Sequence, residues 1–176
     1  VNIAFANELS IICDKLDIDV RELIKLANHH PRVDILQPGC GVGGHCIAVD
    51  PWFIVSKTPD EAQLIHTARK VNDFKPKAVA TQIIRKANFF NTKKIACLGA
   101  AFKPDIDDLR ESPALKIILD LIRAGYTVQL VEPNIKILPK ELAGAACQLV
   151  SLEDILGEEG EQVISILVAH KEFSMS

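Results

Sequence analysis

A short apolar run, Ile95-Ala96-Cys97-Leu98-Gly99, has the length and composition of a buried β-strand. A polar loop follows, and then Ser112-Pro113, a cap and first-turn pair that predicts a helix running to Ala124. Further along, the pattern predicts a second strand that ends in an acid, a short helix and a third strand, at residues 127–133, 149–156 and 163–168. Strands that alternate with helices indicate an α/β fold with a parallel, Rossmann-like sheet.

The preceding part of the chain has a helical pattern. Apolar residues recur every three or four positions over residues 2–14, and again between Asp19, an expected N-cap, and Pro31. The pattern is helical once more over residues 59–90, where Pro76 predicts a kink or a break.

These patterns divide the chain into two expected parts. Residues 1–91 are expected to form a helical region that carries a reactive loop, and residues 92–176 a Rossmann-like domain. Because the chain opens at Val1 inside a helical pattern and stops soon after the third strand, we expect a fragment whose second domain is truncated.

The composition excludes several classes of protein. With 48% hydrophobic and 24% charged residues, the chain is typical of globular proteins, and a net charge of -3 argues against a general nucleic-acid binder. No apolar stretch reaches the roughly 20 residues that span a bilayer, so we expect no membrane anchor. Five scattered cysteines in a chain of this length favour a reduced, cytoplasmic protein.

The densest candidate for chemistry is the glycine-rich segment 38–51. It contains a formal Gly-x-Gly-x-x-Gly at Gly39, Gly41 and Gly44, but the dinucleotide fingerprint needs a strand directly before it, and here helices flank the loop. We expect instead that the glycines allow a positive φ or a close approach to a ligand. They deliver Cys46 to the N-terminus of a helix that Asp50-Pro51 is expected to cap and start.

Cys46 is the candidate nucleophile. The positive end of a helix favours the thiolate, which adds to carbonyl groups, and Asp50 lies four residues further on. The alternative is that a free cysteine is simply a small buried residue, which we expect of Cys13, Cys97 and Cys147. A zinc site drawn from Cys40, Cys46 and the histidines nearby lacks the tight Cys-x-x-Cys spacing, so we expect no metal.

A second candidate lies in residues 99–113, which join the first strand to its helix. Doubly wound sheets bind ligands at this place. Lys103 and Arg110 supply positive charge near a helix N-terminus, which suits a phosphate. The alternative is a solvated loop whose charges compensate one another.

Together the two segments resemble the nucleotide-sugar dehydrogenase family that includes UDP-glucose and GDP-mannose 6-dehydrogenases. The matching pattern is Pro38-Gly39-x-Gly41-x-Gly43-Gly44-x-Cys46-x-x-x-Asp50, followed by Gly99-x-Ala101-Phe102-Lys103 and Leu109-Arg110-Glu111-Ser112-Pro113. Residues 2–9 and 44–54 are most similar to the UDP-N-acetylmannosamine dehydrogenase branch. The resemblance covers essentially the whole chain.

The resemblance implies a central region that forms a homodimer and a C-terminal UDP-binding domain, with a NAD-binding domain and a catalytic lysine and asparagine upstream of this chain. It implies an NAD-dependent, four-electron oxidation of the sugar C6 alcohol to a carboxylate, in which Cys46 forms a thiohemiacetal and then a thioester and Asp50 assists proton transfer. The fragment alone is then expected to be inactive.

The resemblance also implies binding residues. Those expected to contact the UDP-sugar are Arg32 (on the partner subunit's substrate), Gln37, Pro38, Gly39, Gly41, Val42, Gly43, Phe102 and Lys103, and Arg110 is expected near NAD. Cys40 stands where this branch more often has proline. Two alternatives stay open: a sister enzyme acting on UDP-glucose or UDP-N-acetylglucosamine, and a non-catalytic nucleotide-binding module.

Overall fold

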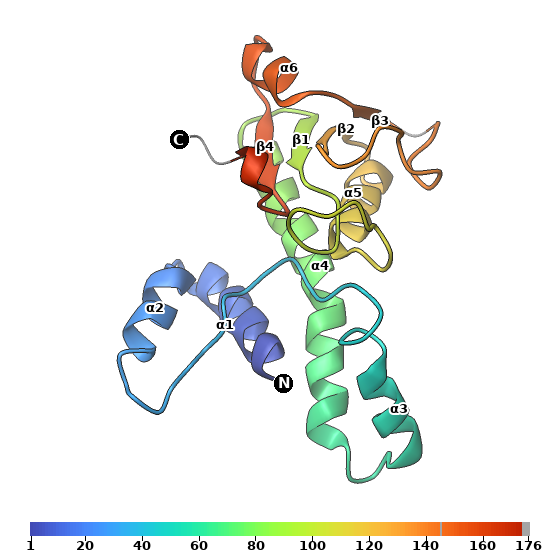
Figure 1. Ribbon diagram of the computed structural model, residues 1–176. Coiled ribbons are helices and arrows are strands. Elements are labelled where there is room, and N and C mark those ends of the chain that lie inside the picture. Colours follow the sequence, from blue (N-terminus) through green and yellow to red (C-terminus); the bar gives the residue numbers. More distant parts are fainter. Residues whose placement is uncertain (145, 174–176) are drawn as a thin grey trace.

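The computed structural model describes residues 1–144 and 146–173, with a β-sheet at one end of the molecule and helices at the other (Figure 1). In chain order the elements are α1 (Asn2–Leu16), α2 (Val20–Ala27), α3 (Asp50–Lys57), α4 (Gln63–Phe89), β1 (Lys94–Leu98), α5 (Pro113–Arg123), β2 (Thr127–Val131), β3 (Cys147–Leu149), α6 (Leu152–Gly157), β4 (Val163–Ile166) and the 3₁₀ turn η1 (Lys171–Phe173). This order confirms the predicted α/β class, a helical region followed by a Rossmann-like parallel sheet.

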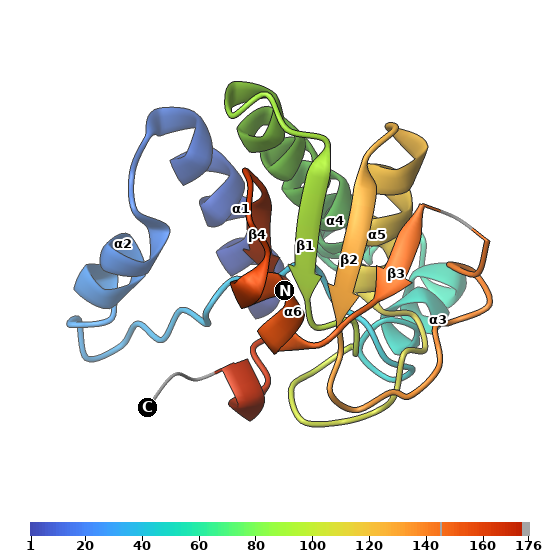
Figure 2. The ribbon, with the colours of Figure 1, turned by 90° about the horizontal axis from the view of Figure 1, so that it is seen from above.

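The strands are parallel and lie in the order β3-β2-β1-β4 (Figure 2). β1 is central, and Ile95 pairs with Val128 on one side and with Val163 on the other. Ile95, Ala96 and Cys97 are fully buried, which confirms the buried strand predicted there. Because parallel strands share a direction, their carboxyl ends meet at one edge, and the loops after β1, β2 and β4 come together at this edge.

The sequence pattern does not predict β3. It assigns residues 149–156 to one helix, whereas a strand ends at Leu149 and α6 begins at Leu152, capped by the Ser151 side chain. β3 has three residues and pairs with β2 at the edge of the sheet. A strand of this length forms because it pairs with its neighbour, so its own three residues show little of the sequence pattern that predicts a strand.

The helix α4 also differs from the prediction. It begins at Gln63 rather than near Pro59, and it continues through Pro76 without a break. Pro76 is buried, and a Cβ built on Gly41 would lie 3.1 Å from its Cγ atom. The proline ring therefore packs closely beside Gly41 of the glycine-rich segment, where a larger residue would meet it.

Two apolar clusters cover the two faces of the sheet. Ala80 and Ile83 of α4 and Ile117 of α5 pack on the face that carries Ile95. Ile155 of α6 packs on the opposite face. The second half of α4 therefore belongs to the core of the sheet, and the helix also packs against α1 and α3. None of the described helices combines the length and apolar character needed to cross a membrane.

Candidate active site

Two loops from different parts of the sequence pack directly against each other. We call residues 38–46 the glycine-rich loop and residues 99–113 the β1–α5 loop. The backbone N–H of Gly44 donates to the carbonyl oxygen of Arg110 (3.4 Å). A Cβ on Gly43 would lie 2.8 Å from the Glu111 carbonyl oxygen and from side-chain atoms of Phe102 and Pro113. The two motifs thus form one continuous surface.

The glycines serve this contact in two ways. Gly41 and Gly44 have φ angles of 138° and 77°, which L side chains rarely adopt, so a positive φ is required as the sequence analysis proposed. At Gly43 the backbone approaches Glu111, Phe102 and Pro113 so closely that a side chain would not fit.

The glycine-rich loop is anchored to the helices and to the sheet. The fully buried Asn7 of α1 accepts from the Gly39 N–H and donates to the Asn72 side chain of α4, both at 2.9 Å. The Cys40 thiol donates to the carbonyl oxygen of Leu167, directly after β4 (3.3 Å). These bonds fix the loop before it reaches Cys46.

Cys46 is exposed and lies just before α3. Its carbonyl oxygen accepts from the N–H groups of Val49 (3.1 Å) and Asp50 (2.8 Å), so the turn that carries it leads directly into the helix. The expected capping by Asp50 is wrong: Asp50 is the first helical residue, and Val49 occupies the cap position without a side-chain hydrogen bond. The positive end of α3 is consequently free of a side-chain cap.

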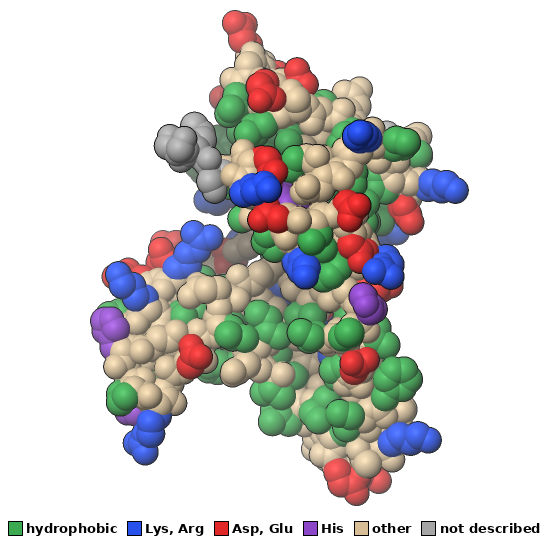
Figure 3. Space-filling view, viewed as in Figure 1, with side chains coloured by type: hydrophobic (Ala, Val, Ile, Leu, Met, Phe, Trp, Pro, Cys, Tyr) green, Lys and Arg blue, Asp and Glu red, His purple; other side chains and the backbone are tan. Residues whose placement is uncertain are grey.

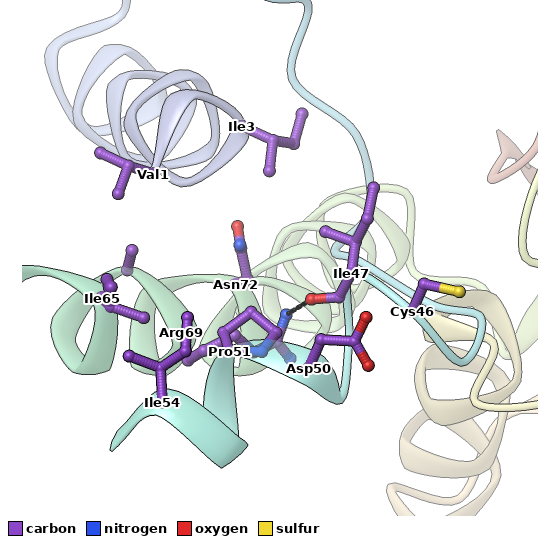
Figure 4. A pocket seen from close by; sticks show the side chains of 11 residues that line it. Val1, Ile3, Cys46, Ile47, Asp50, Pro51, Ile54, Ile65, Arg69 and Asn72 are labelled. Carbon is purple, nitrogen blue, oxygen red and sulfur yellow. Dashed lines mark hydrogen bonds between the residues drawn. The ribbon is translucent and has the colours of Figure 1, made fainter. Parts of the chain in front are cut away.

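A cavity of about 370 Å³ lies beside Cys46, between α1, α3 and α4 (Figure 4). Its walls are largely apolar, and Cys46, Asp50, Arg69 and Asn72 are among its polar members. In this view the Cys46 sulfur points away from Val1 and Ile3, and the Asp50 carboxylate points toward Cys46 (Figure 4). Cys46 and Asp50 therefore both line the cavity, with the thiol directed outward from it (Figure 4).

Arg69 of α4 contacts the short segment that joins Cys46 to α3. The side chain is 6% exposed, forms an ion pair with Asp73 and donates to the carbonyl oxygen of Ile47 at 3.4 Å. Its Nε atom has no hydrogen-bond partner among the described residues. Sequence reasoning missed Arg69, and its one available signal was a charged residue within the apolar helical pattern of residues 59–90.

Cys40 differs sharply from Cys46. Burial raises the pKa of the Cys40 thiol to about 11, against a smaller lowering effect of the nearby Lys75 ammonium. Among the described residues, ligand atoms suited to a metal converge only at Asp105, His170 and Glu172. The structure does not bring Cys40, His45 and Cys46 into such a group.

The β1–α5 loop carries two cationic side chains, Lys103 and Arg110. Of the two, Arg110 forms an ion pair with a carboxylate of the same loop. The Lys103 ammonium is exposed and lies 5.8 Å from the centre of the Phe102 ring. Arg110 donates from Nε and Nη2 to both carboxylate oxygens of Asp108 (2.6 to 3.0 Å), and these bonds lower the pKa of Asp108 to about 2. The charge of Arg110 is therefore compensated by Asp108 within the loop, as the alternative of a solvated loop with compensating charges expects.

Ser112 caps α5 as predicted and also joins the two ends of the β1–α5 loop. Its hydroxyl accepts from the Ala114 N–H (3.2 Å) and donates to the carbonyl oxygen of Ala100 (2.6 Å).

The remaining predicted binding residues spread along the chain. Gln37 is exposed and Pro38 is half-buried, whereas Val42 lines a second cavity of about 350 Å³ together with Trp52 and Lys116. Arg32 is exposed in the turn after α2, and this turn lies apart from α3 in both ribbon views (Figures 1 and 2). The structure does not bring Arg32 together with Cys46 within one chain.

Hydrophobic side chains gather on the lower half of one face of the molecule, over α3 and its surroundings (Figure 3). The exposed apolar side chains of this region include Ile47, Phe53 and Ile54. Exposed apolar side chains therefore gather on and next to α3, and charged side chains are more frequent around the sheet (Figure 3).

Two sequence profiles of one family match this chain. The central domain of the UDP-glucose/GDP-mannose dehydrogenase family matches residues 1–74, and the UDP binding domain of the same family matches residues 96–176.

Individual proteins are similar over nearly the whole chain. A UDP-N-acetyl-D-mannosamine dehydrogenase of Campylobacter jejuni is 62% identical over 175 residues, which are 98% of this chain and 42% of that protein. An NDP-N-acetyl-D-galactosaminuronic acid dehydrogenase of Ralstonia solanacearum is 53% identical over 174 residues, which are 98% of this chain and 40% of that protein. The chain thus spans less than half the length of these curated relatives.

Solved structures share the fold. A UDP-D-ManNAc dehydrogenase from Pyrococcus horikoshii matches with a TM-score of 0.80 and 36% identity, covering 98% of this chain and 39% of that one. A UDP-N-acetyl-mannosamine dehydrogenase from S. aureus also matches with a TM-score of 0.80, at 38% identity and the same coverage. The paired loops, the two profiles and these relatives agree, and the chain belongs to the UDP-glucose/GDP-mannose dehydrogenase family.

Proposed function

We propose that the gene product carrying this chain oxidises C6 of UDP-N-acetylmannosamine to a carboxylate, with NAD as the oxidant. One observation carries the proposal: the exposed Cys46 thiol lies at the uncapped start of α3, beside a surface formed by the glycine-rich and β1–α5 loops. Similar proteins named for this substrate support the choice of sugar.

The second half of such an oxidation explains the need for sulfur. An aldehyde carbon has no hydride to release until a nucleophile adds to it. The Cys46 thiolate adds to the C6 aldehyde, the carbonyl electron pair moves to oxygen, and protonation gives a thiohemiacetal. Loss of the hydroxyl proton and departure of the hydride from the same carbon to the oxidant would leave a thioester, which water hydrolyses to the carboxylate and the free thiol. Asp50, in the first turn of α3, is proposed to orient this water or move its proton.

The glycine-rich loop itself is not proposed to bind NAD. Helices rather than a strand precede the glycine-rich loop, so the dinucleotide fingerprint is absent there. We assign no step of this chain to the cofactor and propose only that Arg110 lies near it. The 176 residues alone are accordingly proposed to be inactive.

The remaining assignments follow the same loops. The residues around Gly39 and Gly43, with Phe102 and Lys103, are proposed to hold the nucleotide sugar. Arg32, exposed and distant from Cys46 in its own chain, is proposed to reach the substrate of a partner subunit in a homodimer. All five cysteines are free thiols, which is consistent with the reduced cytoplasm we propose as its location.

The test compares sugars in the complete gene product. UDP-N-acetylmannosamine, UDP-glucose and UDP-N-acetylglucosamine are each supplied with NAD, and NADH absorbance and the uronate are measured. We expect two NADH per UDP-N-acetylmannosamine and no NADH from the 176-residue chain alone. Preference for another sugar would replace the substrate assignment, and UDP binding without NADH would favour the non-catalytic module.

A further inference from the structure

A buried carboxylate lies beneath the β1–α5 loop. Glu132, directly after β2, has no exposed side-chain surface. Its Oε2 atom accepts from the backbone N–H groups of Ala100 (2.7 Å) and Ala101 (3.1 Å), and its Oε1 atom accepts from the Asn134 N–H (3.1 Å). One side chain thus holds the start of the β1–α5 loop.

A buried imidazole completes the arrangement. His170, which follows β4, lies with Nε2 at 3.0 Å from Glu132 and has no exposed side-chain surface. Its Nδ1 atom accepts from the backbone N–H of Asp105 (2.9 Å). Because an N–H group must donate, Nδ1 carries no proton, and we assign the proton to Nε2, which donates to Glu132.

The imidazole bonds to the backbone at Asp105, whose φ angle is unfavourable for residues other than glycine. Asp105 has a φ of 60°, in the left-handed region, and its carboxylate accepts from the Lys171 N–H (2.9 Å). Asp105, His170 and Glu172 could approach a metal ion together, but the Asp105 N–H already occupies the Nδ1 lone pair of His170. The contacts therefore indicate a clamp on the backbone rather than a metal site.

Phe102 and Lys103 lie between the two anchored points. Glu132 fixes the backbone at Ala100 and Ala101, and His170 fixes it at Asp105. Neither buried side chain belongs to the pattern that identifies the family, and each comes from a segment outside the two motif loops. Both follow strands at the carboxyl edge of the sheet, where they can act on a loop without touching its ligand.

We propose that Glu132 and His170 are positioning residues that hold Phe102 and Lys103 in the geometry that binds the nucleotide part of the substrate. This inference rests on the proposed function and adds two residues to it. Loss of the clamp frees the loop, so binding of the UDP-sugar weakens while the chemistry at Cys46, on another loop, continues once substrate is bound.

The test uses His170 variants of the complete gene product. We expect His170→Ala to raise the KM for the UDP-sugar about tenfold, with kcat changed less than about threefold. His170→Asn can keep an acceptor near Nδ1, and His170→Gln can keep a donor near Nε2. Both should bind the UDP-sugar better than His170→Ala and better than His170→Leu, because leucine fills the space without a hydrogen bond, whereas a merely space-filling role would make the leucine variant at least as good.

The matched control removes a hydrogen bond at the amino ends of the strands, opposite the end of the sheet where the clamp lies. The Tyr126 hydroxyl donates to the Asn88 side chain at 2.6 Å, and Tyr126→Phe should lower the melting temperature with no change in KM. If His170→Ala, or His170→Leu where the alanine protein does not fold, keeps the wild-type KM while the wild type turns over, the clamp is wrong and the function stands. A wild type that neither binds UDP nor turns over would overturn both.

Discussion

Cys40 and Cys46 belong to one loop, yet their environments are opposite. Cys40 is partly buried against the core of the sheet, donates to the Leu167 carbonyl oxygen and has a pKa raised by burial to about 11. Cys46 is exposed at the start of α3, where backbone N–H groups lack a side-chain cap. The path of the backbone, rather than the residue type, therefore buries one thiol and exposes the other, and the exposed thiol is the one we propose for the chemistry.

The largest expected effect comes from removing one thiol or the other. In the complete gene product, Cys46→Ala should lower uronate formation by at least about a thousandfold, because no other nucleophile can form the thioester. Cys40→Ser keeps a hydroxyl that can donate to Leu167 and should stay within about threefold of the wild type. Similar losses in both variants would erase the distinction between the thiols.

Alkylation compares the thiols without turnover. With iodoacetamide at pH 8, Cys46 should react about a hundredfold faster than Cys40 or Cys97, because the thiolate reacts and burial raises the pKa of both other thiols. Peptide mapping at successive times gives the rates. Equal alkylation rates at several cysteines of the folded protein would contradict the difference between Cys46 and the buried thiols.

The junction between the loops can be broken at Gly43. An added methyl group in Gly43→Ala would meet three atoms at 2.8 Å, one of them a backbone oxygen. We expect a loss of about 1–3 kcal/mol in the free energy of unfolding and weaker UDP-sugar binding. Gly157→Ala, where a Cβ meets nothing within 4 Å, serves as the control in the same urea titration. Comparable stability of both variants would argue against the tight junction.

The smallest effect is the pH dependence that Cys40 contributes. Its pKa rises from 9.0 to about 11 on folding, so the folded chain holds the proton more tightly. The resulting stability is complete below pH 9 and is lost as the pH rises toward 11. Between these pH values the wild type should lose roughly 1–2 kcal/mol more than Cys40→Ser. Parallel pH curves for the two proteins would refute the buried state of this thiol.

Local patterns account for much of the fold and for the motif residues. A short apolar run predicts β1, and the Ser112-Pro113 pair predicts the start of α5, because both signals lie within a few neighbouring residues. β3 escapes prediction because its three residues are held by pairing with β2. The division of the chain into two domains between residues 91 and 92 stays a prediction. The second half of α4, which precedes that boundary, packs in the core of the sheet.

The anchors of the candidate site were beyond the reach of sequence patterns. Asn7, Arg69 and His170 act on backbone groups far away in the sequence, and no spacing rule links them to those groups. Glu132 had one usable signal, an acid directly after an apolar strand. Such residues shape a site through tertiary contacts, which a single sequence does not display.

Trapping the covalent intermediate tests the central claim most directly. The complete gene product is mixed with NAD and UDP-N-acetylmannosamine, quenched in acid during turnover, and digested for mass spectrometry. The account predicts a uronyl thioester on the peptide that carries Cys46, and none on the peptides of the other four cysteines. Steady uronate formation with an unmodified Cys46 peptide at every quench time, in a wild type whose Cys46→Ala variant remains active, would contradict it.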